Sequence, residues 1–134
     1  MRYCLLLLLA LALSGCGTAP ASRPVEVAKP ITLTAKQISS VRSGVTRFLK
    51  NEDLEGVQLG RTIAGRTSAA VIVCGYANGK NGAGELVGER PFHGLFLGMD
   101  NASSFIVTGM GGTDTDNAAT LELCRRSGLE LTPS

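Results

Sequence analysis

Apolar side chains recur at helical spacing in the first half of the chain. They lie three or four residues apart, on one face of a helix: Ile38, Val41, Val45 and Phe48, with Leu49 beside them. Thr34 precedes this stretch and Gln37 lies three residues further on, which is the Thr-x-x-Gln pattern of a capping box. The pattern predicts an amphipathic helix over residues 34–51. Its apolar stripe is suited to a membrane or a partner protein, and more simply to the domain's own sheet.

Four later stretches predict strands. The clearest is residues 69–74, which is β-branched and apolar on both faces, as is typical of a central strand. The other three stretches are residues 57–64, 85–97 and 103–110. Pro91 in the third stretch predicts an edge or a bend there, because proline has no backbone N–H for a ladder. A glycine- and asparagine-rich run at residues 76–84 predicts a long loop.

The chain ends with a second helical pattern. Residues 113–117 are helix-starting residues, residues 118–127 predict a short helix, and Gly128 suits its left-handed cap. Short connections imply antiparallel pairing of the strands. We therefore expect one α+β domain over residues 31–134. It should be a four-stranded, mainly antiparallel sheet with both helices packed on one face.

The N-terminus carries a separate signal. Arg2 precedes an unbroken apolar run over residues 5–13, which Ser14, Gly15 and Cys16 follow. The run is about half the ~20 residues that a bilayer-spanning helix needs, and it fits the core of a signal peptide. The Leu-Ser-Gly-Cys ending resembles a bacterial lipoprotein signal, which implies cleavage after residues 1–15 and lipid attachment at Cys16. A secretory signal without lipid and a buried N-terminal helix are the alternatives.

The residues after the signal predict a tether and a location. Residues 16–30 are rich in proline, alanine and small polar residues and have no apolar period, as in a flexible linker. Gly17 stands where lipoproteins kept at the inner membrane commonly have aspartate. The expected location is the cell envelope, with the domain anchored to the outer membrane through its lipid and facing the periplasm or the surface.

The cysteines support this location. Cys4 would leave with the signal and Cys16 would take the lipid, so Cys74 and Cys124 remain in an oxidising compartment, where disulfides persist. The sequence predicts that these two form a disulfide, and two buried free thiols are the alternative. No metal site is predicted, because two cysteines and a distant His93 lack the ligand number of a structural zinc site.

Charge and motifs narrow the function classes. The chain has 13 basic and 11 acidic residues, and without Arg2 the balance is 12 against 11, a net charge of about +1. This is no footprint for nucleic acid, which requires a clustered basic face. His93 is the only histidine, and the Gly-x-Ser-x-Gly nucleophile motif is absent. We predict no catalytic residues and no cofactor; an enzyme that gathers His93 with two acidic residues is the alternative.

One segment carries a recognisable motif. Residues 74–92 read Cys-Gly-x-x-Asn-x-Lys-Asn, then glycines, then Pro-Phe. This resembles a motif of small secreted proteins and lipoproteins of proteobacteria whose function is uncharacterised. The matching residues are Cys74, Gly75, Asn78, Lys80, Asn81, Gly84, Gly88, Pro91 and Phe92, with Cys124 as the partner cysteine. The resemblance covers about residues 34–129 and fails at residues 51–55. It implies a fold and a disulfide, and no activity.

Four polar residues in or near the predicted loop are the candidate binding residues. Asn78, Lys80, Asn81 and Arg90 are suited either to holding a tight backbone conformation or to forming a recognition surface. The predicted function is a non-enzymatic binding or structural module of the envelope, with another envelope protein as a possible partner. The alternative is a periplasmic inhibitor that inserts residues 78–84 into a hydrolase such as lysozyme.

Overall fold

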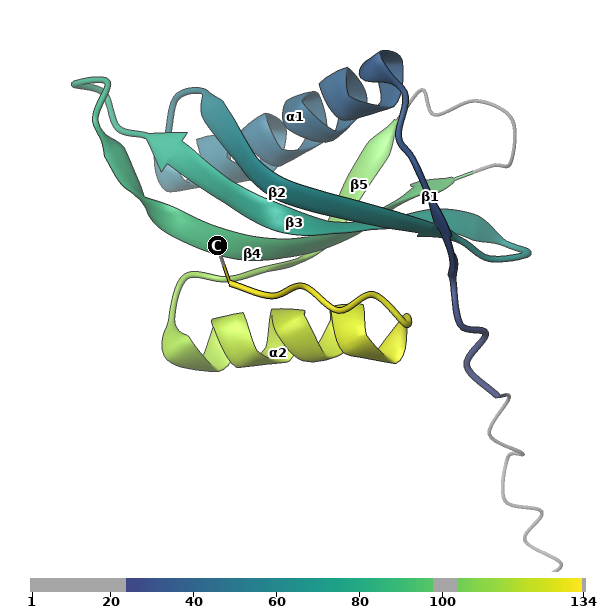
Figure 1. Ribbon diagram of the computed structural model, residues 1–134. Helices are drawn as coiled ribbons and strands as arrows, with labels where there is room; N and C mark the ends of the chain where they lie inside the picture. The colour runs from purple at the N-terminus through teal and green to yellow at the C-terminus, as the bar shows by residue number, and fades with distance from the viewer. Residues whose placement is uncertain (1–23, 98–103, 134) are drawn as a thin grey trace, which may run out of the picture.

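A computed structural model describes residues 24–97 and 104–133. These residues form an antiparallel sheet of five strands that lie side by side in chain order (Figure 1). The strands are β1 (Lys29–Ile31), β2 (Val57–Arg66), β3 (Ala70–Lys80), β4 (Leu86–Leu97) and β5 (Phe105–Met110). The helices are α1 (Ala35–Leu49), the short 3₁₀ turn η1 (Lys50–Glu52) and α2 (Asp114–Arg126). The predicted α+β class with an antiparallel sheet and two helices is confirmed.

The predicted number of strands is wrong, because β1 was missed. This strand has three residues, which pair with Arg66, Gly65 and Ala64 of β2. A segment this short has no period of its own to detect, and its proline and lysine favour a linker. The sheet therefore includes Lys29 and Pro30, which the sequence assigned to the tether. Of the tether and the signal, residues 1–23 lie outside the described part of the chain.

The expectation that both helices share one face of the sheet is also wrong. Helix α1 covers one face and α2 covers the other, so the domain has three layers (Figure 1). Alternate side chains of β3 explain the arrangement. Val71 and Val73 pack with α1, whereas Ile72 and Cys74 pack with the segment around Cys124. A strand that is apolar on both faces needs cover on both faces.

The core on the α1 side is the larger one. Its aromatic centre consists of Phe92, Phe96 and Phe105, and the rings of Phe92 and Phe105 meet edge to face with centroids 6.1 Å apart. Gly75 makes room for this centre, because a Cβ atom there would lie 2.7 Å from the ring of Phe92. The helix contributes Val41, Val45 and Leu49.

Both helices lie close to their predicted positions, but α1 ends at Leu49 instead of near residue 51, and α2 begins at Asp114, four residues before the predicted helix at residues 118–127. Thr34 caps α1 in a complete capping box with Gln37, and Thr113 accepts a hydrogen bond from the Asp116 backbone at the start of α2. Gly128 has a φ of +78°, the left-handed conformation expected after the second helix. These features depend on neighbours in sequence, so local patterns suffice to find them.

A smaller core holds the α2 layer. Cys74 of β3 and Cys124 of α2 form a disulfide whose Cα atoms are 6.0 Å apart, so the predicted pairing is confirmed. Leu129 packs beside the disulfide, with Ile63 and Ile72 of the sheet around it. Little apolar area surrounds this bond, and the covalent link is therefore central to holding α2 on the sheet.

Candidate functional site

The candidate binding residues lie on a long hairpin and not in a long loop. Asn78 and Lys80 are within β3 and Arg90 is within β4, so the predicted loop at residues 76–84 is wrong in extent. Backbone pairing extends both strands through a glycine-rich sequence that favours turns. The described part of β5 pairs with β4 only as far as Phe92. The closed end of the hairpin consequently projects past β5 (Figure 1).

Asn81 holds the tip of this hairpin. Its side-chain oxygen accepts hydrogen bonds from the backbone N–H groups of Ala83 and Glu85, at 3.0 and 2.9 Å. Its amide nitrogen donates to the Glu85 carboxylate at 3.1 Å, and the two backbones bond as well. One side chain thus replaces several missing ladder bonds. The tip is built to keep one conformation.

Asn78 and Arg90 are also engaged inside the molecule. The Asn78 side chain accepts a hydrogen bond at 2.9 Å from the backbone N–H of Gly88. Gly88 has a φ of +118° at an irregularity of the β3–β4 register, a conformation that favours glycine. Arg90 forms an ion pair with Glu52 of η1. Together these contacts tie the hairpin to its own bulge and to the end of α1.

The same hairpin also exposes three side chains that make no polar contact with the described residues, those of Lys80, Leu86 and Val87. Leu86 and Val87 are 47% and 42% exposed, which is unusual for two adjacent apolar residues in a strand. The Lys80 side chain is exposed, and within the described part of the chain it has no hydrogen-bonding or ionic partner. Leu86 and Val87 were not predicted as surface residues, because an apolar pair at the start of a strand is the ordinary signal for a buried position.

His93 is buried and lies between two hydroxyl groups. Its Nδ1 is 2.6 Å from the hydroxyl of Thr108, and its Nε2 is 3.4 Å from that of Ser127. The Thr108 hydroxyl is also 3.3 Å from the His93 carbonyl, and the Ser127 hydroxyl donates to the Leu123 carbonyl at 3.0 Å. Burial lowers the pKa of His93. Both side chains within hydrogen-bond distance of the ring carry hydroxyl groups, and neither is acidic.

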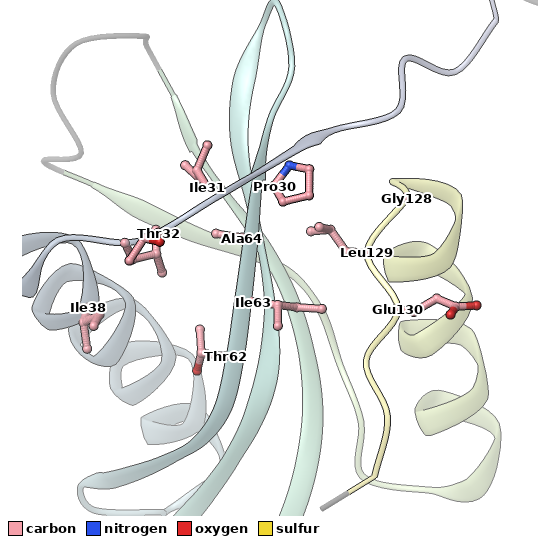
Figure 2. A pocket seen from close by; sticks show the side chains of 11 residues that line it. Pro30, Ile31, Thr32, Ile38, Thr62, Ile63, Ala64, Gly128, Leu129 and Glu130 are labelled. Carbon is pink, nitrogen blue, oxygen red and sulfur yellow. The ribbon is translucent and has the colours of Figure 1, made fainter.

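A groove follows the outer edge of β2 where β1 ends. Its volume is about 460 Å³, within the range of small-molecule sites, and Figure 2 shows its walls. Ile38 of α1 stands on one side, while Ile63 and Leu129 pack together on the other. Its remaining lining residues are Pro30, Ile31, Thr32, Leu33, Thr62, Ala64, Gly128 and Glu130. The groove is mainly apolar and offers one charged group, Glu130.

Comparison with known protein families, characterised proteins and solved structures finds no match to this chain. Over residues 24–97 and 104–133, no helix is both long and apolar enough to cross a bilayer. In the same residues, no three histidine, cysteine or acidic side chains are grouped so that they could hold a metal ion.

Proposed function

We propose that this protein is a lipid-anchored module of the bacterial cell envelope that binds another envelope component without catalysing a reaction. The Leu-Ser-Gly-Cys sequence at residues 13–16, at the end of an apolar run, carries the proposal. The lipid would be attached at Cys16. Gly17 favours the outer membrane, with the domain facing the periplasm or the surface.

Two further features support an envelope location. The disulfide between Cys74 and Cys124 is of a kind that persists in oxidising compartments. Twelve residues lie between Cys16 and Lys29, the first residue of the sheet. A chain of that length spans at most about 45 Å, which is sufficient to lift a small domain off a lipid surface.

The test compares the wild-type protein with Cys16→Ser by intact mass and membrane fractionation. We expect the wild type to begin at Cys16, to carry a lipid-sized mass increment and to sediment with membranes. Cys16→Ser should lose both the increment and the sedimentation. Cys4→Ser is the matched control and should behave as wild type. A wild-type chain that keeps Met1 and stays with the cytosol would refute the proposal.

A second candidate function rests on the hairpin. A rigid tip that projects from a domain loses little conformational entropy on insertion into a cleft, as a hydrolase inhibitor requires. Asn81 supplies that rigidity, and Lys80, Leu86 and Val87 are the exposed side chains that would enter the cleft.

A lysozyme activity assay tests this candidate. The parent protein should inhibit, Lys80→Ala and Leu86→Ala should weaken the inhibition, and Arg125→Ala on α2 should leave it unchanged. Absence of inhibition by the parent protein, or equal weakening by all three variants, would refute the inhibitor function.

A further inference from the structure

The outward face of α1 carries a regular row of basic and hydroxyl side chains. Its members are separated by four, three, four and three residues, which places them on one face of a helix. We call this the basic row: Lys36, Ser40, Ser43, Arg47 and Lys50. It lies opposite the buried positions Val41, Val45 and Leu49. At 1.5 Å per residue the row is about 21 Å long.

Among the described residues, no ion pair neutralises Lys36, Arg42 or Arg47, whereas Lys50 lines a surface hollow together with Asp53 and Glu55. Helix α1 contains no acidic residue, and Arg42 adds a fourth cation beside the row. In the described part of the chain, the side chains of Lys36, Arg42, Arg47 and Lys50 are exposed and have no hydrogen-bonding or ionic partner. The nearest carboxylate in sequence after the row is Glu52, whose charge is paired with Arg90.

Helix α2 provides the contrast within the same molecule. Its cations Arg125 and Arg126 both bond to Glu122, at 2.7 and 2.9 Å. These contacts lower the pKa of Glu122 to about 2. Asp114 and Asp116 add further negative charge to that helix. The two helices therefore differ in charge: the charged residues of α1 are all cations, whereas α2 carries three acidic residues against two arginines.

We infer that the basic row binds a linear polyanion, such as an acidic polysaccharide of the envelope. Each cation that neutralises a charge on such a polymer releases condensed counterions, which favours binding at low salt. The serines between the cations are short, so a polymer chain can approach the helix closely. This inference deepens the proposed function by naming the chemistry of one partner, and it rests on that function only for the location of the polymer.

Two other occupants fit the row less well. The centre of a protein interface is normally apolar or aromatic and depleted in charge, and the row contains no apolar side chain. The direction in which the N-terminal segment leaves the domain disfavours the anchoring membrane as the partner of the row. Residues 24–28 leave the sheet toward the α2 layer, where the Ala28 backbone bonds to Ser127 (Figure 1). The row therefore lies on the opposite side of the domain from the departing chain.

The test measures binding of a fluorescent heparin decasaccharide to the full-length chain carrying Cys16→Ser. Affinity should fall linearly with the logarithm of salt concentration, with a slope of about three for three row cations. Lys36→Gln/Arg47→Gln should reduce the slope by about two and weaken binding about tenfold or more at low salt. Arg125→Gln/Arg126→Gln is the matched control, since it removes the same charge from α2. It should change affinity less than twofold.

Three results would overturn the inference. The first is no binding by the parent at low salt, and the second is equal weakening by both double variants. The third is tighter binding to phosphatidylglycerol vesicles than to heparin, which would assign the row to a membrane. Circular dichroism melts of both variants should match the parent, because all four substituted side chains are exposed. None of these results bears on the mass and fractionation experiment, so the anchoring proposal fails or holds separately.

Discussion

Removal of the disulfide should detach α2 from the sheet before the rest of the domain unfolds. The perturbation is the double variant Cys74→Ala/Cys124→Ala, which avoids burying a polar hydroxyl at two positions that are both 0% exposed. The α1 layer keeps its aromatic core in this variant. In the cluster around the disulfide, the α2 layer keeps Leu129 and its partly buried neighbours Ile63 and Ile72.

The expected loss in free energy of unfolding follows from the length of the loop that the disulfide closes. The two cysteines are 50 residues apart, and closing a loop of that length contributes about 4 kcal/mol in the chain-entropy account. A domain of this size is typically stable by about 5–15 kcal/mol, so the loss is a large fraction of the free energy of unfolding. The corresponding decrease in melting temperature is about 15–30 °C.

Hydrogen exchange measured by mass spectrometry gives the protection of each layer, and urea unfolding gives the loss in free energy of unfolding. Amides of α2 (Asp114–Arg126) should lose protection far more than those of β3 (Ala70–Lys80). Val45→Ala on α1 is the control, because it weakens the other core without loosening α2 selectively. A free-energy loss below about 1 kcal/mol, or equal loss of protection in both layers, would refute the reasoning.

Three further predictions test single side chains. Because burial lowers the pKa of His93, the unfolded chain binds the proton first as pH falls below about 6.5, so stability should fall between pH 7 and pH 5. His93→Gln should flatten that urea-midpoint profile, and an unchanged slope would contradict it. Asn81→Ala should cost about 1–2 kcal/mol and expose the Ala83 amide to exchange, whereas undiminished protection would contradict its role. Gly75→Ala should cost about 1–3 kcal/mol in thermal melts, since its Cβ meets the Phe92 ring; a neutral effect would show that the ring can shift.

The helices were predictable because their signals are local, whereas the strands depended on partners. Thr34 and Thr113 act on backbone groups within three residues, so the caps could be found from the sequence. Strand β1 exists only because β2 offers it three pairing positions. The apolar character of both faces of β3 was recognised, and it already implied cover on both sides. The prediction that both helices share one face was wrong. The face that a helix covers depends on the path of the chain between the helix and the sheet, which the sequence pattern does not reveal.

The candidate site was predictable in its residues and not in their roles. Asn78, Asn81 and Arg90 were singled out as special positions on a glycine-rich segment. Their partners Gly88, Glu85 and Glu52 show that all three help to hold the hairpin. Arg90 and Glu52 are 38 residues apart, and no local pattern reveals such a pair. Lys80 alone among the four candidates keeps an exposed side chain without a partner among the described residues.

The edges of the sheet bear on how such a module would work when tethered. Residues 57–63 of β2 extend beyond the short β1, so among the described strands nothing covers that part of the outer edge. The register of β2 shifts between Leu59 and Thr62, and that of β5 shifts opposite His93 and Gly94. Bulges of this kind twist an edge and disfavour pairing with another chain. Copies anchored to one membrane would meet at high effective concentration, where flat edges would aggregate. If the domain is tethered as proposed, we expect it to stay monomeric, because its irregular sheet edges disfavour pairing with a second copy.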